Sequence, residues 1–409
     1  MEVTKIKDPT RDRYRALAFN SAWNLETIRN ASALIVGAGA LGNEVGKNLA
    51  LMGLRTILIV DRDTVEVANL TRSVFFREKD HGRPKAVVLA ERLVELNPEV
   101  NAIALDGDID QVLGLGLVRR MDLIFSCLDN RMARRSVNRA CEKLAKPWVD
   151  GAMENLLGDI TVCIPDETPC YECGLTANDK EIIARATSCQ HIALQNLALG
   201  KIPTISTMGS IISALQVQEA LKLLHGNRRV LKSGNRLVIN CESNDFYITA
   251  GERNEACEGH FRYGEITEMP GWSVDHTSGQ QILKHFAQTD SSKAHLRLGR
   301  EIVVGLRCHN CEVTEDLGQA VHLLSEAILR CLICGNARET LTTNVILGDE
   351  PFSDWPLSRL GIPRLDVLEA RSSRDCVWYE MTGDLPAFPF NNGRDTDVSH
   401  SSVTAFHKE

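Results

Sequence analysis

Three cysteines within residues 168–190, TPCYECGLTANDKEIIARATSCQ, have a residue type and a spacing that can support chemistry. Cys170 and Cys173 form a C-x-x-C pair, and Cys189 follows sixteen positions later. Thiols in such a pattern can bind a metal ion, form disulfides or act as a nucleophile. The chain has 13 cysteines, an odd number, so a fully paired disulfide framework is not expected. In a reducing compartment, spaced cysteines are better explained as metal ligands or reactive thiols.

A second group of cysteines lies in RCHNC (307–311) and RCLICG (330–335). Cys308, Cys311, Cys331 and Cys334 follow the pattern C-x₂-C-x₁₉-C-x₂-C, which is typical of a zinc ribbon. Four protein ligands leave no position for water, so the sequence predicts a structural zinc site within a ribbon at about 300–345. A competing assignment joins Cys170 and Cys173 to one of these pairs and leaves the other pair free.

A glycine pattern early in the chain predicts a nucleotide site. Gly37, Gly39 and Gly42 form G-x-G-x-x-G between an apolar run and the start of a helical pattern. Such a turn brings backbone N–H groups and a helix N-terminus close to a phosphate. The next apolar run ends in Asp61 and Asp63, where a carboxylate can accept ribose hydroxyls. These features alone fit an NAD dehydrogenase equally well.

Polar residues further along favour a triphosphate over a dinucleotide. They are Asn69, Arg72, Lys85, Asp129 and Asn130, all expected near the C-terminal edge of the sheet. Arg72 and Lys85 can neutralise phosphate charge, and Asp129 can hold Mg²⁺. Taken singly, Arg72 and Lys85 could equally be ordinary surface residues of a loop and a helix.

The elements that must position these residues alternate between apolar runs and amphipathic helical patterns. Residues 32–42 are predicted to form a strand, a glycine turn and the start of a helix. Further strands are predicted in 55–63, 122–130, 146–153 and 158–165, and helices in 84–98, 131–145 and 209–226. We therefore expect an α/β fold with a Rossmann-like, mainly parallel sheet over residues 1–262. Residues 263–385 should form a smaller β-rich module containing the zinc ribbon, and residues 386–409 a flexible tail.

Composition excludes several classes of function. The net charge is −8 and no long basic run occurs, which argues against nucleic-acid binding. No apolar stretch approaches a membrane span, and no apolar segment follows a basic start. We expect a cytoplasmic protein that does not bind membranes.

The ordered motifs resemble one family in particular. GAGALG, DRDTVEVANLTRSVFFREKDHGRPKAVVLAERLVELNP and CLDNRMARRSVNRACEKLAKPWVDGAM are similar to the adenylating domain of the ThiF/MoeB and ubiquitin-activating superfamily, over about residues 10–262. The resemblance implies binding of ATP and Mg²⁺, and adenylation of the C-terminal glycine of a ubiquitin-fold partner. It assigns ribose to Asp61, the phosphates to Asn69 and Arg72, the α-phosphate region to Lys85 and the metal to Asp129.

The resemblance also implies a homodimer in which an N-terminal arginine reaches the partner's nucleotide. Residues 13–16 read RYRA, so Arg13 and Arg15 are the candidates, and Arg15 is the one we assign. The same resemblance also implies the remaining ligands of the first zinc site. RNEACEGH (253–260) offers Cys257 and His260 as partners of Cys170 and Cys173. The site would then have three cysteines and one histidine, the second of two structural zinc sites in the chain.

Cys189 falls in the interval that the family uses as a crossover loop above the nucleotide. A cysteine there can attack the acyl-adenylate if its thiol is partly ionised. The alternative is a cysteine without a role, and Cys376 is a rival reactive thiol. We therefore expect an activating enzyme for a ubiquitin-like protein that forms a thioester on Cys189 for a conjugating enzyme. The alternatives are a sulfur-carrier adenylyltransferase without an obligatory thioester, or a degenerate scaffold subunit.

Overall fold

The computed structural model describes residues 12–176, 178–179, 204–227, 231, 235–288, 292–320, 324, 328–390 and 403–406. These residues form two compact units. The first unit contains the residues up to Ile109, Val118–Arg262 and the segment from Phe390 onward. The second unit contains Asp110–Leu117 and Tyr263–Pro389.

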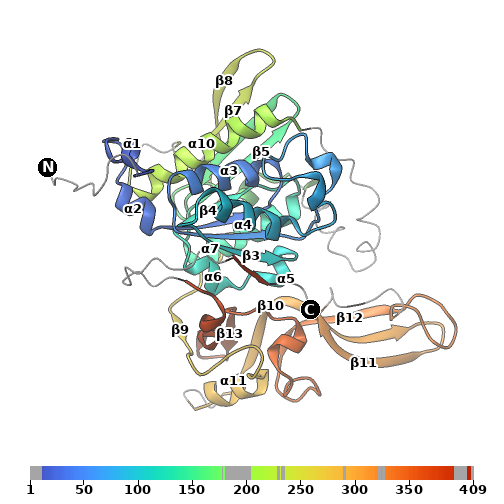
Figure 1. The fold of residues 1–409 in the computed structure, drawn as a ribbon. Coiled ribbons are helices and arrows are strands. Elements are labelled where there is room, and N and C mark those ends of the chain that lie inside the picture. The colour runs from blue at the N-terminus through green and yellow to red at the C-terminus, as the bar shows by residue number, and fades with distance from the viewer. Residues whose placement is uncertain are drawn as a thin grey trace. The chain divides into compact units, whose positions relative to one another are not determined.

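The first unit is built on a nine-stranded sheet with the order β15-β3-β2-β1-β4-β5-β6-β7-β8 (Figure 1). Neighbouring strands are parallel from β15 to β5 and antiparallel from β5 to β8. The strands are β1 (Ser32–Val36), β2 (Thr56–Asp61), β3 (Asn101–Asp106), β4 (Leu123–Ser126), β5 (Trp148–Glu154), β6 (Leu157–Cys163), β7 (Asn235–Asn240), β8 (Asp245–Ala250) and β15 (Val403–Phe406). A mainly parallel α/β sheet confirms the predicted fold class.

Helices follow the parallel strands, as the crossover connections of such a sheet require. The α-helices from residue 15 to 224 are α1 (Arg15–Ala18), α2 (Leu25–Asn30), α3 (Ala40–Leu51), α4 (Lys85–Leu96), α5 (Ile109–Val112), α6 (Leu115–Arg119), α7 (Arg131–Leu144) and α10 (Ser206–Leu224). The helices predicted at 84–98, 131–145 and 209–226 are confirmed as α4, α7 and α10.

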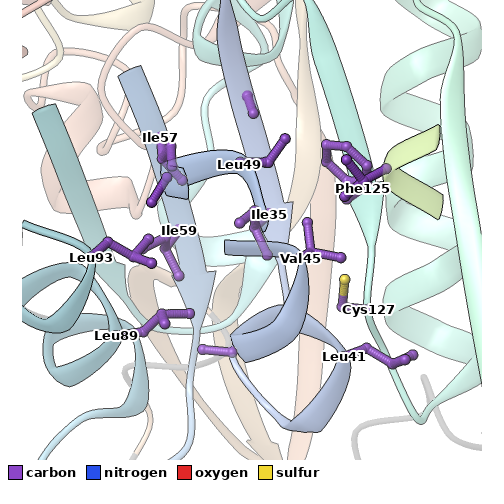
Figure 2. Close-up of a cluster of buried hydrophobic side chains, with 14 of the residues drawn as sticks. Ile35, Leu41, Val45, Leu49, Ile57, Ile59, Leu89, Leu93, Phe125 and Cys127 are labelled. Atoms are coloured by element: carbon purple, nitrogen blue, oxygen red, sulfur yellow. The ribbon is translucent and has the colours of Figure 1, made fainter. Parts of the chain in front are cut away.

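A core of apolar side chains fixes α3 and α4 against the sheet (Figure 2). Its members include Ile35, Val45, Leu49, Ile57, Ile59, Leu89, Leu93 and Phe125, all buried. Each such side chain contributes about 1.5–3 kcal/mol when removed from water. The N-termini of both helices are therefore held in place beside the ends of β1 and β2.

The second unit has its own sheet and its own core. The strand order is β11-β10-β13-β14-β9, and β12 also pairs with β10. Its elements are β9 (Ile266–Glu268), α11 (Gly279–Phe286), β10 (His295–Cys308), β11 (Val313–Ala320), β12 (Glu339–Ile346), β13 (Val367–Arg371) and β14 (Cys376–Glu380). Ser278 caps α11 by accepting a hydrogen bond from the Gln281 backbone. This β-rich unit carries the predicted zinc-ribbon cysteines.

One element lies in the segment that we expected to be a flexible tail. Strand β15 pairs in parallel with β3, from Val403 opposite Ala102 to Phe406 opposite Leu105. Val403 and Ala405 pack against the core of the first unit. These apolar contacts account for an ordered strand in an otherwise polar stretch of sequence.

Candidate functional site

The glycine turn lies at the point where the strand order reverses. β1 has β2 on one side and β4 on the other, so the chain leaves β1 in one direction and returns on the opposite side. Ligands of open α/β sheets bind beyond the carboxyl ends of the strands at such a switch point. The turn between β1 and α3 therefore occupies the expected place for a nucleotide.

Each glycine of the turn has a different steric role. Gly37 has a φ of +96°, and a Cβ added there would lie 2.5 Å from the Cys127 carbonyl oxygen. A Cβ added to Gly42 would lie 1.9 Å from the Gly37 carbonyl oxygen, so α3 can approach the turn only without a side chain. Gly39, the N-cap of α3, has nothing within 4 Å of an added Cβ. The turn is thus closed behind Gly37 and Gly42 and open at Gly39, where a phosphate could approach the backbone.

Asp61 ends β2 beside this turn. Its carboxylate accepts hydrogen bonds from the backbone N–H of Ala38, at 2.6 Å, and of Asp63, at 2.8 Å. Burial raises the pKa of Asp61 to about 6, although the nearby Lys85 ammonium opposes the rise. A carboxylate that has lost water gains from new hydrogen-bond donors, and ribose hydroxyls are suitable donors.

Lys85 is the first residue of α4, and its side chain is held in the same region. Its Nζ lies 2.8 Å from Asp63 Oδ2, and its backbone N–H donates to the Asp63 carbonyl. Burial lowers the pKa of Lys85, but the Asp61 and Asp63 carboxylates outweigh this effect and leave the pKa above its ordinary value. Lys85 therefore stays charged, as a phosphate-binding lysine must.

Asn69 and Arg72 lie in and after a short 3₁₀ helix, η1 (Val67–Asn69). Asn69 is buried, and its side-chain oxygen accepts from the Glu66 backbone at 2.9 Å. The Arg72 guanidinium donates to the Ala68 carbonyl at 2.7 Å. Both side chains have local partners that fix their positions, and no contact between them and Lys85 is recorded among the described residues.

Asp129 and Asn130 follow β4, on the other side of the switch point. Asn130 is the N-cap of α7, and its Oδ1 accepts from the Ala133 backbone at 2.8 Å. Asn130 thus has a structural role at the start of α7, and its assignment to the cofactor stays a prediction. Asp129 is exposed and, within the described part of the chain, has no hydrogen bond or ion pair. Its charge still contributes to the raised pKa of Lys85, and a carboxylate of this kind fits a Mg²⁺ ligand.

Arg15 does not lie with these residues. Its neighbour Tyr14 is buried, and the Tyr14 hydroxyl accepts a hydrogen bond from Asn97 at 2.7 Å. Asn97 is the C-cap of α4, whereas Lys85 begins that helix. A helix of 12 residues is about 18 Å long, so Tyr14 anchors Arg15 far from the glycine turn of its own chain.

Four of the predicted metal ligands come together in the first unit. Cys170, Cys173, Cys257 and His260, here the first tetrad, have ligand atoms that all lie within 4.8 Å of one another. The Cys170 Sγ lies 3.7 Å from Cys173 Sγ and 3.8 Å from Cys257 Sγ. A tetrahedral zinc with bonds of about 2.3 Å requires sulfur atoms about 3.8 Å apart. The spacing fits zinc, and His260 would bind through Nε2, which lies 3.3 Å from Cys173 Sγ.

The knuckle of the first tetrad is tied to α7. Glu172, between the two cysteines, is buried and pairs with Arg135 at 3.0 Å and with Arg139 at 2.8 Å. Burial raises the pKa of Glu172, but the two arginines outweigh it and hold the pKa below its ordinary value. This contact was not predicted from the sequence. Its only sequence signal is the spacing of four between the arginines, which places both on one face of a helix.

The second tetrad (Cys308, Cys311, Cys331 and Cys334) is also assembled, within the second unit. Both knuckles end in a left-handed residue, Glu312 with φ of 53° and Gly335 with φ of 73°. Backbone N–H groups of Cys334 and Ile333 lower the pKa of Cys331 to about 6, whereas a hydrogen bond with Cys334 raises the pKa of Cys311 to about 12. Four adjacent thiols cannot all ionise without a cation, and a zinc ion is the cation that suits them.

The two candidate nucleophiles, Cys189 and Cys376, differ in what the structure describes of them. Cys189 lies outside the described residues, so its surroundings are not part of the structure. Cys376 begins β14, and burial raises the pKa of its thiol above the ordinary value. A raised pKa reduces the thiolate fraction, which does not favour Cys376 as a nucleophile.

The chain also has a buried polar network that the sequence analysis missed. Arg134 of α7 donates to the Leu128 carbonyl at 2.7 Å and lies 3.3 Å from the Asp150 carboxylate. Asp150 in turn accepts from Ser126 at 2.6 Å. No sequence pattern marks this network. Arg134 donates to a backbone carbonyl, and Asp150 lies on a different strand from Ser126.

In the described part of the chain, no helix is long and apolar enough to cross a membrane.

The chain is similar to several known proteins. The chain is 34% identical over 216 residues to ubiquitin-like modifier-activating enzyme 5 of Dictyostelium discoideum, a match that covers 49% of this chain and 54% of that protein. It is 30% identical over 202 residues to the sulfur carrier protein ThiS adenylyltransferase of Escherichia coli, covering 49% of this chain and 75% of the relative. A crystal structure of E. coli MccB with AMPCPP and MccA matches 60% of this chain and 74% of its own, with 25% identity and a TM-score of 0.49.

The chain spans about half the length of the ubiquitin-like modifier-activating enzymes that it matches. The model of the ThiF family matches residues 12–259, which is more than half of the 409 residues. That match includes the glycine turn, the polar residues around it and the first tetrad up to Cys257. The chain therefore belongs to the ThiF family of E1-like adenylating enzymes.

Proposed function

We propose that this chain uses ATP to adenylate the C-terminal glycine of a ubiquitin-like protein and then carries that protein as a thioester on Cys189. The observation that supports adenylation best is the set of charges around the open glycine turn. Lys85 stays cationic between two carboxylates, and Asp129 lies across the switch point with no hydrogen bond or ion pair to any residue that the structure describes. A dinucleotide would not need a cation and an acceptor placed in this way.

Adenylation needs charge neutralisation more than proton transfer. The carboxylate of the partner's C-terminal glycine attacks the α-phosphorus of ATP, the bond to the β-phosphate breaks, and pyrophosphate leaves. The nucleophile is already ionised at neutral pH, so no general base is required. Lys85 and Arg72 stabilise the charge on the phosphates, Asn69 orients them and Asp61 accepts the ribose hydroxyls. Mg²⁺ held by Asp129 neutralises phosphate charge when it is bound.

Thioester formation is the finer part of the proposal. The Cys189 thiolate attacks the carbonyl carbon of the acyl-adenylate, AMP leaves, and a conjugating enzyme then receives the partner. Among the described residues before Cys189, Asp179 pairs with Arg131 in the first turn of α7.

The test is ATP–pyrophosphate exchange with ubiquitin-fold proteins that end in a free glycine. Exchange that depends on such a partner supports adenylation, and its absence with every such partner would leave the scaffold alternative. A thiol-labile adduct that disappears in Cys189→Ala, while exchange persists, isolates the thioester step. Exchange without any adduct would instead favour a sulfur-carrier adenylyltransferase, the alternative suggested by the 75% coverage of the ThiS enzyme.

We also propose that the active form is a homodimer in which Arg15 serves the partner's nucleotide. The supporting observation is that Tyr14 anchors the start of α1 beside Asn97, at the far end of α4 from Lys85. Arg15→Ala and Asp129→Ala chains would each be inactive alone. Mixing them should restore about a quarter of wild-type exchange, if chains pair at random and only one of the two sites in a mixed dimer is intact. No recovery on mixing would argue that each chain uses its own arginine.

A further inference from the structure

Arg134 is a charged side chain that the proposed reaction does not use directly. It lies in the first turn of α7 and its side chain is 15% exposed. One guanidinium nitrogen donates to two backbone carbonyls, that of Leu128 at 2.7 Å and that of Gly151 at 3.2 Å. Its Nε lies 3.3 Å from the Asp150 carboxylate, the partner of Ser126.

Stability alone does not account for this arrangement. Removing an arginine and a carboxylate from water costs several kcal/mol for each ion, and apolar residues of similar volume often serve the fold as well or better. The guanidinium instead fixes the orientation of the groups that accept its hydrogen bonds. It is planar and holds several acceptors in a fixed geometry, which a lysine or an apolar side chain cannot do.

The two carbonyls belong to neighbouring segments on one side of the switch point. Leu128 directly precedes Asp129, and Gly151 lies on β5, the strand beside β4. Fixing the Leu128 peptide fixes the direction in which the next residue leaves the backbone. Asp129 is exposed and has no hydrogen bond or ion pair of its own in the described structure, and the Arg134 guanidinium restrains the peptide directly before it.

We propose that Arg134 is a positioning residue for adenylation: it fixes the Leu128 peptide so that the Asp129 carboxylate points toward the magnesium-bound triphosphate. The proposal rests on the proposed function, because Asp129 is a metal ligand only if the chain binds Mg²⁺ and ATP. Catalytic groups must be held within a fraction of an ångström, and neighbouring side chains usually supply that restraint.

The test compares Arg134→Met and Arg134→Lys with the wild type in ATP–pyrophosphate exchange over a range of Mg²⁺ concentrations. Arg134→Met should raise the Mg²⁺ concentration for half-maximal exchange about tenfold or more, and Arg134→Lys should raise it less. A purely structural role would lower the amount of active enzyme without moving this concentration. Amide exchange of the peptide covering residues 127–130 should also become faster in Arg134→Met. Arg338→Met is the matched control, because Arg338 is also a buried arginine that donates to a backbone carbonyl, that of Ile328, and pairs with a carboxylate, that of Glu315, but belongs to the second unit.

A double-mutant cycle with Asp129→Asn separates an action through Asp129 from an independent one. If Arg134 acts through Asp129, its replacement should add little to the Mg²⁺ requirement of Asp129→Asn. Effects that multiply, or an unchanged Mg²⁺ requirement and amide exchange in both folded Arg134 variants, would overturn the proposal. Arg134→Lys keeps the test open if Arg134→Met does not fold. A wild type without any partner-dependent exchange would overturn the proposed function itself, and this assignment with it.

Discussion

At the scale of single residues, Lys85 is held between two carboxylates before any nucleotide binds. The Asp63 side chain of its ion pair is 58% exposed, so the pair contributes little to folding stability. Lys85→Met should therefore leave the melting temperature nearly unchanged while ATP–pyrophosphate exchange falls about 100-fold or more. Lys47→Met is the control for the loss of a paired lysine, because Lys47 forms an ion pair with Glu44 on α3. Equal losses in the two variants would contradict a role for Lys85 at the phosphates.

Asp61 predicts a pH dependence of nucleotide binding. Burial raises its pKa to about 6, so below pH 6 the apo protein carries a neutral carboxyl group that accepts ribose hydroxyls poorly. The dissociation constant for ATP should rise about tenfold for each pH unit below 6, as calorimetry between pH 5 and 8 can measure. In Asp61→Asn the affinity should be weak and independent of pH in this range. A wild-type profile that stays flat down to pH 5 would exclude Asp61 from the ribose site.

The same pKa has a consequence for stability. Because folding raises the pKa from its ordinary value of 3.8, folded Asp61 binds a proton more tightly than unfolded Asp61 between pH 4 and 6. Stability from this group is therefore greatest at low pH and is lost as the pH rises through 6. Relative to Asp61→Asn, the nucleotide-free wild type should lose about 2–3 kcal/mol of unfolding free energy between pH 4 and pH 7. Urea unfolding of both proteins at several pH values measures the difference.

At the scale of elements, the turn between β1 and α3 offers two similar substitutions with opposite expected results. Gly42→Ala places a Cβ 1.9 Å from the Gly37 carbonyl oxygen, so α3 must move and the protein should lose about 3 kcal/mol or fail to fold. Gly39→Ala meets nothing within 4 Å and should fold normally. Its new methyl group should instead weaken ATP binding, because it faces the open side of the turn. Thermal unfolding and nucleotide titration distinguish the two effects.

Elements with strong periodicity were predictable from sequence. α4 and α7 have apolar residues at helical spacing and β1 and β2 are continuous apolar runs, so both periods are visible in the chain. β15 was not predictable, because Val403–Phe406 is short and its pairing with β3 joins residues some 300 positions apart. All six residues of β8 are exposed, among them Phe246 and Ile248. The strand therefore has no buried face, and the alternation of apolar and polar residues that predicts a half-buried strand is not expected in it.

At the scale of the whole molecule, the site residues could be predicted where their spacing along the chain forms a known pattern. The glycine turn and the second tetrad are of this kind. Cys257 and His260 are more distant, 87 positions from their partners, and came from family resemblance rather than from spacing. Arg134 was missed because its partners include two backbone carbonyls, which no sequence pattern marks. Long-range contacts with backbone atoms depend on packing, and packing is what the sequence alone does not reveal.

The two tetrads lie in different compact units, and each is part of its own unit's structure. Cys170, Cys173, Cys257 and His260 belong to the first unit, and the four ribbon cysteines belong to the second. We predict two zinc ions per chain, each stabilising its own unit, since closed four-ligand sites contribute directly to folding. Native mass spectrometry should count two ions in the wild type and one in either Cys257→Ser or Cys334→Ser.

Because each unit has its own core, the loss of zinc from the first tetrad and from the second tetrad should have different consequences. Cys334→Ser should lower the melting temperature of the second unit while ATP binding by the first unit persists. Cys257→Ser should weaken ATP binding, because the first knuckle holds α7 through Glu172, and α7 begins next to Asp129. His260→Cys should retain the metal, since a fourth thiolate is an equally good zinc ligand. If one substitution removed both ions, or the wild type held a single ion, the tetrads would not be independent metal sites.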